Sequence, residues 1–242
     1  MSPRHAVVLA GGRGTRLRPY TVTLPKPLVP VHDLPILEII LRQLVRCGFA
    51  SATIAVNHQA ELIRAYFGDG AKWNITLSYS VEQQPLGTMG PLRIMHGLPE
   101  QFLVMNGDVL TDLDFDAFFA AHVSSGALFT ISGISRVQPV DFGVLHVGDG
   151  GVLAAFEEKP KLDCVVSMGV YAVSRRVLPW IPDGAAFGFD QLMHALIEAG
   201  ESVRVRIHDG FWMDIGRPDD YQDVCERWPE LAPRLLPDCD VG

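Results

Sequence analysis

A glycine-rich turn directly after an apolar stretch is the feature that most constrains this chain. Residues 5–10 are apolar enough to form a buried strand. Gly11, Gly12 and Gly14 follow at once. Because glycine has no Cβ and tolerates positive φ, the backbone N–H groups of such a turn can point toward a single anion. The segment therefore predicts a strand whose end brings bare backbone close to a ligand.

Positive charge is concentrated around this turn. Four cations follow within a short stretch of chain: Arg13, Arg16, Arg18 and Lys26. Arginine binds phosphate oxygens through two parallel hydrogen bonds, and lysine acts as a point charge. Pro25 and Pro27 restrict the backbone on both sides of Lys26, which a solvated surface lysine does not need. A glycine-rich turn alone is as often a plain turn, but with these cations it predicts a polyphosphate site.

The spacing of the three glycines excludes two well-known phosphate-binding loops. No Gly-Lys-Ser/Thr follows the turn, so it is not a P-loop. Glycines at positions 11, 12 and 14 do not fit G-x-G-x-x-G, so it is not the dinucleotide fingerprint either. The sequence therefore predicts a phosphate site of a different kind.

Composition and charge limit the classes of protein to which the chain can belong. Its 242 residues are enough for one large domain or two small ones. A net charge of −8 argues against nonspecific nucleic-acid binding, which needs a basic surface. No apolar run approaches the length of a membrane span, and a strand that begins by residue 5 or 6 leaves no room for a signal peptide. We therefore expect a cytoplasmic protein without nucleic-acid or membrane partners. The cysteines show no metal spacing and are expected to be reduced structural thiols: Cys47, Cys164, Cys225 and Cys239.

The first 110 residues alternate between strand-like and helix-like segments. Helices are predicted at 35–47, 61–67 and 88–96, and strands at 52–56, 75–79 and 102–105. This alternation predicts an α/β fold with a largely parallel sheet flanked by helices. Ligands in such sheets bind beyond the carboxyl ends of the strands. Gly11-Gly12 and Asn106-Gly107-Asp108 both follow a predicted strand, so we expect them at one edge of the sheet.

The pattern changes after about residue 125. Strands separated by Gly and Asp turns are predicted at 127–133, 143–147, 152–156 and 165–173, and helices at 188–199 and 217–227. Gly148 to Gly151 form a hairpin signal between two of these strands. We expect one domain, 1–242, in which residues 1–125 form a binding half and residues 126–230 a β-rich lid. Residues 233–242 show little periodicity and are expected to fray.

Two carboxylates are candidates for holding a metal ion near the phosphates. Asp108 follows a predicted strand, and Asp214 lies among apolar residues in a Phe-Trp-Met-Asp-Ile-Gly segment. Mg²⁺ binds one or two carboxylates together with phosphate oxygens and water. The alternative for Asp108 is a turn residue that bonds its own backbone. The alternative for Asp214 is a charge at the start of the next helix, but Asp219 and Asp220 already supply that charge.

Together these features resemble the signature of the sugar-1-phosphate nucleotidyltransferases. The resemblance includes the glycine turn and Pro25-Lys26-Pro27, and it covers about residues 5–225. It implies a Rossmann-like mixed sheet with a nucleotide-binding half and a sugar-binding lid half, without the β-helix that some members add. It also implies that Asp108 and Asp214 jointly hold one catalytic Mg²⁺. Among short members, the chain is most similar to the heptose-1-phosphate and mannose-1-phosphate guanylyltransferases.

The resemblance places the nucleotide against the binding half. Pro85-Leu86-Gly87-Thr88 resembles the family segment that lies against the nucleobase. Gln83 and Gln84 come just before it, and their amides can read a base edge because each offers a donor and an acceptor. Met89 stands where the family commonly has Ala. The expected nucleotide-binding residues are Leu9, Gly11, Gly12, Gly14, Thr15, Gln83, Pro85, Gly87 and Thr88.

The second half carries the segments that resemble the family's sugar site. Glu157-Glu158-Lys159-Pro160 resembles the family's E-E-K-P, in which the second Glu accepts sugar hydroxyls and the Lys binds the sugar phosphate. Without the other motifs, a solvated charge run would be the preferred interpretation. Phe142-Gly143 resembles the family's Y-G pair, and Ser167 replaces an Asn that is usual in the family. The expected sugar-phosphate-binding residues are Asn106, Gly143, Glu158, Lys159, Ser167 and Val170.

The implied reaction transfers a nucleoside monophosphate from an NTP to a sugar-1-phosphate and releases pyrophosphate. The sugar phosphate oxygen attacks the α-phosphorus in line, so positioning and charge neutralisation carry the step without a protein nucleophile. Gly11, Gly12 and Arg16 are expected to hold the leaving pyrophosphate, and Lys26 to steady the α-phosphate. Arg16 and Lys26 are therefore the catalytic candidates. GTP with a heptose or mannose 1-phosphate is the first expectation. Another base (ATP, CTP, UTP or dTTP), another sugar-like phosphate and a homo-oligomeric state stay open.

Two other functions are compatible with parts of this pattern. A glycosyltransferase that consumes an NDP-sugar should show a D-x-D metal motif, and the segment from Asp112 to Asp116 formally matches it twice. That function leaves Arg16 and Lys26 without a role. A sensor that binds an NDP-sugar without turnover needs no clamp for a leaving group, which the set of Arg16, Lys26, Asp108 and Asp214 would supply. Release of pyrophosphate distinguishes the nucleotidyltransferase from both the glycosyltransferase and the sensor.

Overall fold

The central element of the structure is a seven-stranded mixed sheet. The computed structural model describes residues 3–12, 14–57 and 59–237. In the order β12-β8-β11-β6-β1-β4-β5, the strands pair parallel except where β11 runs antiparallel to β8 and β6. Their bounds are β1 Arg4–Leu9, β4 Phe49–Val56, β5 Thr76–Val81, β6 Gln101–Asn106, β8 Phe129–Pro139, β11 Lys161–Ser174 and β12 Val203–His208. The predicted α/β class and largely parallel sheet are confirmed.

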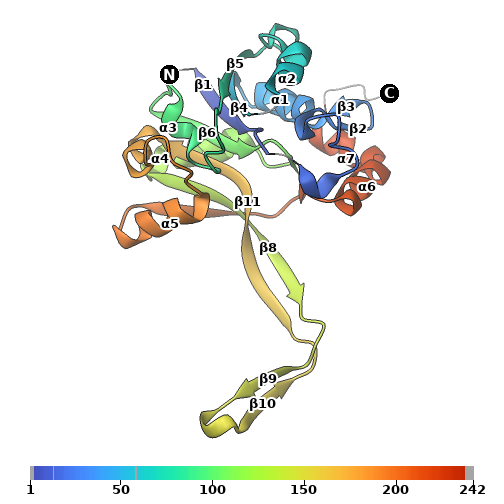
Figure 1. Ribbon diagram of the computed structural model, residues 1–242, viewed down its shortest axis with the longest axis vertical. Helices are drawn as coiled ribbons and strands as arrows, with labels where there is room; N and C mark the ends of the chain where they lie inside the picture. Colours follow the sequence, from blue (N-terminus) through green and yellow to red (C-terminus); the bar gives the residue numbers. More distant parts are fainter. Residues whose placement is uncertain (1–2, 13, 58, 238–242) are drawn as a thin grey trace.

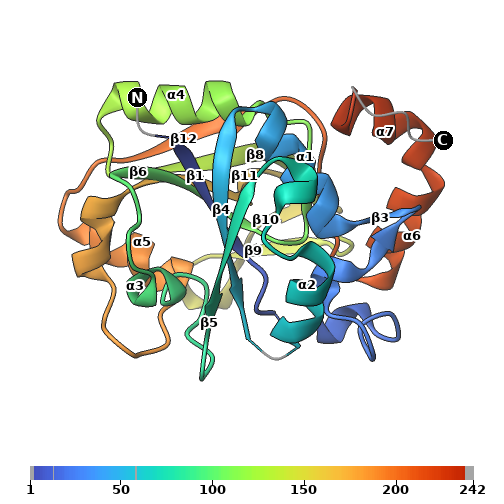
Figure 2. The same cartoon turned by 90° about the horizontal axis from the view of Figure 1, so that it is seen from above.

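Helices cover both faces of this sheet, because alternate residues of the strands point to opposite sides. In β1, Ala6 and Val8 join one buried cluster while Val7 joins the other. The helices are α1 Ile36–Arg46, α2 Ala60–Phe67, α3 Pro91–Ile94, α4 Phe115–Ser125, α5 Phe189–Glu198, α6 Pro218–Glu226 and α7 Trp228–Leu235. Residues of α1, α2, α4, α6 and α7 belong to the first cluster, and residues of α3 and α5 to the second. Figure 2 shows α3 and α5 close together, with α6 and α7 on the opposite side of the molecule.

Short elements complete the fold. Four of the 3₁₀ helices are η1 Thr15–Leu17, η2 Lys26–Leu28, η3 Ala71–Trp73 and η5 Arg175–Trp180. Two short ladders join β2 Pro30–Val31 to β3 Leu34–Pro35, and β7 Val109–Thr111 to β13 Trp212–Asp214. Among the described residues, no helix is both long and apolar enough to cross a membrane.

Most predicted elements are confirmed, and two differ. The predicted helix at 88–96 is only the single turn α3, because Gly87 has φ +75° and the proline at position 91 begins the helix. The predicted irregular tail from Pro233 begins too early, since α7 continues to Leu235 and the chain is buried through Leu236. Residues 238–242 of that prediction lie outside the described residues.

The second half joins the first instead of covering it. Strands β8, β11 and β12 extend the central sheet, and only the outer part of β8 and β11 leaves it. This two-stranded ribbon ends in a hairpin of β9 Val144–Val147 and β10 Leu153–Glu157, linked by η4 Asp149–Gly151. The predicted hairpin is confirmed. Figure 1 shows it at the far end of an arm that projects from the body of the molecule. We call residues 134–166 the arm.

Candidate active site

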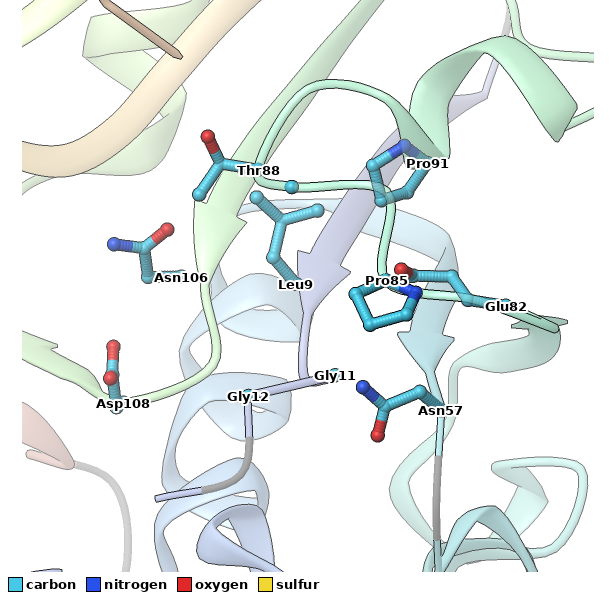
Figure 3. Close-up of a pocket in the computed structure, with 11 residues that line it drawn as sticks. Leu9, Gly11, Gly12, Asn57, Glu82, Pro85, Thr88, Pro91, Asn106 and Asp108 are labelled. Atoms are coloured by element: carbon cyan, nitrogen blue, oxygen red, sulfur yellow. The ribbon is translucent and has the colours of Figure 1, made fainter. Parts of the chain in front are cut away.

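The glycine turn and the Asn-Gly-Asp segment lie together at one edge of the sheet, as predicted. Gly11 and Gly12 follow β1, and Asp108 follows the neighbouring strand β6. The backbone N–H of Gly107 donates to the carbonyl of Leu9 at 2.9 Å, which fixes the two strand ends against each other. A cavity of about 460 Å³ opens at this edge (Figure 3). It is lined by Leu9, Gly11, Gly12, Asn57, Glu82, Pro85, Gly87, Thr88, Pro91, Asn106 and Asp108.

Chain pairing brings the second carboxylate to the same place. In the ladder of β13 with β7, Asp214 is opposite Val109, and the N–H of Ile215 donates to the Asp108 carbonyl at 3.1 Å. Asp108 and Asp214 are far apart in sequence, but this ladder sets them side by side. The structure therefore joins the two predicted metal ligands.

Lys26 lies between these carboxylates. It forms an ion pair with Asp108 through Oδ2, and its Nζ is 4.0 Å from Asp214 Oδ1. Its side chain is only 10% exposed, as expected for a lysine whose backbone is held by Pro25 and Pro27. A small hollow of about 50 Å³ is lined by Lys26, Gly12 and Asp108 and shares the last two with the larger cavity.

The single positive charge of Lys26 does not balance the negative charges of Asp108 and Asp214. Burial, followed by the negative charge of Asp108, raises the pKa of Asp214 to about 6, although Lys26 and Arg16 act against this rise. Oδ1 of Asp108 and Oδ1 of Asp214 are both buried without a hydrogen-bond partner among the described residues. A buried carboxylate oxygen without a partner is costly. The pair therefore suits a divalent cation.

The donor set fits Mg²⁺ bound together with a phosphate ligand. Within the part of the chain that the structure describes, no group of three or more His, Cys, Asp or Glu side chains could hold a metal. Mg²⁺ keeps several waters and uses one or two carboxylates plus phosphate oxygens, so it does not need such a cage. Asp108 and Asp214 are the two residues that would hold it.

The remaining residues of the phosphate loop have separate positions. Arg16 is exposed and lies near the carboxylate pair. Its charge acts to lower the pKa of Asp214, and a Cβ on Gly216 would lie 3.6 Å from Arg16 Nη2. Gly14 has φ +59°, and a Cβ there would lie 2.9 Å from Thr21 Cγ2, so it shapes the loop. Gly14 and the exposed Thr15 are not among the residues that line the cavity. Arg13 lies outside the described residues.

The predicted nucleobase segment lines the cavity in part. Pro85, Gly87 and Thr88 face it, whereas Gln83 is exposed and does not line it. Thr88 Oγ1 accepts a hydrogen bond from the N–H of Phe189 at 2.8 Å, which ties the segment to α5. Met89 is fully buried in the second hydrophobic cluster, so its side chain packs inside the protein and not against a ligand.

Three cavity residues were not predicted: Pro91, which begins α3, and the polar residues Asn57 and Glu82. Asn57 follows β4, and Glu82 follows β5. Glu82 Oε2 accepts from the N–H of Leu86 at 3.0 Å, and burial raises the pKa of the Glu82 carboxyl. Figure 3 shows both polar residues on the side of the cavity opposite Asn106 and Asp108. The rule that identified Asp108, a polar residue just beyond a parallel strand, applies equally to these two.

The predicted sugar-binding residues are divided between two places. Asn106 lines the cavity, and a Cβ on Gly169 (φ +74°) would lie 2.6 Å from Asn106 Nδ2. The irregular part of β11 between Ser167 and Tyr171 therefore packs against the cavity wall. Ser167 is half-buried, with its hydroxyl 3.3 Å from the Tyr171 hydroxyl, and the Val170 side chain is fully buried in the core. The other three residues, Gly143, Glu158 and Lys159, lie on the arm, away from this cavity (Figure 1).

The carboxylates of the D-x-D segment all make contacts within the protein. Asp112 forms an ion pair with Arg234, a hydrogen bond with the His208 ring at 2.8 Å, and accepts from the N–H of Phe211. Asp114 caps α4 by accepting from the N–H of Ala117 at 3.0 Å. Asp116 pairs with Arg4 at 2.6 Å. These contacts disfavour a metal-binding glycosyltransferase motif at this segment.

Comparison with known proteins agrees with this geometry. The family pattern described as nucleotidyl transferase matches residues 5–229. The chain belongs to this family. The matched range contains the glycine turn, the Pro-Lys-Pro segment and both carboxylates. The resemblance to the nucleotidyltransferase family is confirmed.

Individual relatives name different substrates. The chain is 35% identical to the mannose-1-phosphate guanylyltransferase catalytic subunit beta of Danio rerio, covering 89% of this chain and 62% of that protein. It is 32% identical to the UTP–glucose-1-phosphate uridylyltransferase of Synechocystis sp., covering 89% of this chain and 61% of that protein. The chain thus spans about three fifths of the length of these relatives.

A solved structure shares the fold. A putative glucose-1-phosphate thymidylyltransferase from Bacillus anthracis, in complex with a sucrose, superposes with a TM-score of 0.77 at 20% identity. The match covers 99% of this chain and 97% of that one. At this identity the likeness concerns the architecture.

Proposed function

We propose that this chain transfers a nucleoside monophosphate from an NTP to a sugar-1-phosphate and releases pyrophosphate. The observation that carries the proposal is the cluster of Lys26, Asp108 and Asp214 beside the glycine turn. Asp108 lines the main cavity, and Lys26 lines the small hollow that adjoins it. Membership of the nucleotidyl transferase family supports it. A site that combines glycine backbone, a buried lysine and a pair of carboxylates is suited to a polyphosphate with its metal ion.

Each group has a task in an in-line displacement at the α-phosphorus. The backbone of Gly11 and Gly12, with Arg16 nearby, would hold the β- and γ-phosphates that leave as pyrophosphate. Lys26 would place its charge at the α-phosphate, where negative charge gathers in the transition state. Asp108 and Asp214 would hold Mg²⁺, which when bound supplies charge neutralisation at the reacting phosphates.

We propose GTP as the nucleotide. Glu82 and Asn57 lie on the side of the cavity away from the carboxylate pair, where the base would extend (Figure 3). Guanine presents two neighbouring N–H donors on its pairing edge, which suit a carboxylate acceptor, whereas uracil has one donor between two acceptors. The 35% identity to a mannose-1-phosphate guanylyltransferase supports the same base and a mannose- or heptose-type phosphate. UTP with glucose-1-phosphate is the second candidate, on the 32% identity to a uridylyltransferase.

The test is a matrix of five NTPs against mannose-, heptose- and glucose-1-phosphate, scored by pyrophosphate. The proposal predicts release only when both substrates and Mg²⁺ are present, with GTP preferred. Glu82→Gln should reduce the preference for GTP more than it reduces turnover, and Gln83→Ala, an exposed neighbour, is the matched control. Tight binding of an NDP-sugar without pyrophosphate release would favour a sensor and contradict the proposal.

A further inference from the structure

The arm holds its tip away from the body of the same chain. From Lys161 opposite Pro139 to Ser167 opposite Gly133, β11 and β8 pair residue by residue without a break. The register shifts only between Ser167 and Tyr171, where the arm meets the central sheet. Figure 1 shows the ribbon running outward from that point to the hairpin of β9 and β10. In this structure the paired ribbon therefore keeps the tip away from the cavity of its own chain.

The hairpin at the tip has an uncovered apolar face. Leu145 is opposite Phe156, and Val147 is opposite Leu153, so these four side chains share one face of the two-stranded sheet. They are between 55% and 67% exposed. The other face carries a hydrogen bond of 3.0 Å between His146 and Glu157. A two-stranded hairpin is at best marginally stable alone in water, and an exposed apolar face of this kind marks an interaction surface.

The same tip carries the residues that resemble the family's sugar site. Gly143 and Glu158 are neighbours, because a Cβ on Gly143 would lie 3.2 Å from Glu158 Oε2. Lys159 follows, and Phe142 beside Gly143 is 77% exposed. The cavity that these residues would serve lies on the body, beside Asn106 and Asp108. In a single chain, the nucleotide side and the sugar side of the site are therefore separated.

We propose that two copies of this chain exchange arms, so that the tip of one copy completes the sugar side of the cavity on the other. This inference rests on the proposed function for the role of Glu158 and Lys159. A second copy of the chain is the partner that fits best. Its Glu158 and Lys159 would complete the cavity, and the same contact would cover the apolar face of the hairpin. A two-fold dimer makes the exchange reciprocal and leaves no arm uncovered.

The body offers a receiving surface next to the cavity. An apolar groove of about 630 Å³ lies between α5, β12 and the base of the arm, lined among others by Val165, Phe189, Val205 and Ile207. Phe189 also donates its N–H to Thr88, which lines the nucleotide cavity, so groove and cavity adjoin. A partner's apolar hairpin face seated in this groove would bring its Glu158 and Lys159 toward that cavity.

Mixed variants test the exchange directly. Asp108→Asn disables the body, and the double variant Glu158→Gln with Lys159→Met disables the arm tip. Co-expressed with different tags, the two inactive chains form heterodimers in which one site has both an intact body and an intact tip. Random pairing then restores about one quarter of wild-type turnover. Purified heterodimers without restored turnover would overturn the proposal, and so would full activity of the arm-tip variant alone.

Sedimentation tests the dimer without relying on activity. We expect the wild-type chain to sediment as a dimer and Leu145→Asp to sediment as a folded monomer, because it places a charge on the apolar face. Leu62→Asp, on the exposed surface of α2, is the matched control and should remain dimeric. A monomeric wild type, or a dimer that Leu145→Asp leaves intact, would overturn the exchange. A dimer that behaves as expected but turns over none of the substrates would instead refute only the proposed function.

Discussion

Replacing Lys26 with Met should lower kcat more than it raises the KM for the NTP. The Lys26 amine is buried between two carboxylates and 4.0 Å from Asp214 Oδ1. Two unit charges at this separation interact by about 4 kcal/mol at an effective dielectric constant of about 20. If the α-phosphate oxygen lies at a similar distance in the transition state, loss of the amine should cost two to three decades in kcat, or about 3–4 kcal/mol.

The same substitution should change the pH dependence. The pKa of Asp214 is already raised to about 6 by burial and by Asp108, and the charge of Lys26 acts to lower it. Without that charge the pKa should rise further. At limiting Mg²⁺, the acid limb of the rate profile should therefore move to higher pH, because Asp214 must be ionised to hold the metal.

Steady-state kinetics at one fixed ionic strength decide between two roles for Lys26. Lys26→Arg should restore little activity, because a broad planar guanidinium does not fit a position held for a point charge. Lys72→Met, at an exposed lysine that does not line the cavity, is the control and should leave kcat and KM unchanged. A raised KM with unchanged kcat and good rescue by Arg would mean that Lys26 only attracts the nucleotide, and would refute the reasoning.

Three further predictions follow from individual residues. Asp108→Asn keeps the shape of the side chain but removes its charge, so turnover should fall by at least about two decades, while near wild-type turnover at limiting Mg²⁺ would contradict its role as a ligand. Glu158→Gln should weaken binding of the sugar-1-phosphate and leave NTP binding nearly unchanged when each is titrated by calorimetry, whereas equal loss of both would point to a structural role. Burial lowers the pKa of His122 from 6.5 to about 4, so the unfolded state binds a proton more readily than the folded state. The free energy of unfolding should therefore fall by up to about 3 kcal/mol as the pH drops from above 6.5 toward 4. Urea unfolding of the wild type and His122→Gln at several pH values should show that loss only in the wild type.

The part of the site that depends on strand ends was predictable from sequence. Gly11, Gly12 and Asp108 follow apolar strands, and Asn106 is the last residue of one. Parallel strands bring their carboxyl ends to one edge of the sheet. Glu82 could have been found by the same rule. The amide side chains of Gln83 and Gln84 instead suggested base-reading residues, but both are exposed and neither lines the cavity.

The joining of Asp108 to Asp214 could not be derived from local pattern. It depends on the short ladder of β7 with β13, a pairing between distant segments that no periodicity reveals. The resemblance to a family supplied that pair instead. Gly14 shows the opposite case: its position in the glycine turn suggested contact with a ligand, but its positive φ and the nearby Thr21 methyl give it a role in shaping the loop.

The arm was the least predictable feature. Its strands alternate and turn as expected, and the hairpin at Gly148 to Gly151 was identified. What the sequence pattern does not contain is how far β8 and β11 remain paired beyond the sheet. That length decides whether Glu158 and Lys159 face the cavity of their own chain or that of another copy.

The central claim is tested most directly by following both products of one reaction mixture. Purified protein with GTP, mannose-1-phosphate and Mg²⁺ should release pyrophosphate and form the NDP-sugar in equal amounts, as read by phosphorus NMR. Omission of either the sugar phosphate or Mg²⁺ should abolish both signals. The Lys26→Met variant should abolish nearly all of both under the same conditions. Unchanged substrates with every NTP and sugar phosphate pair, or consumption of an added NDP-sugar without pyrophosphate, would contradict the account.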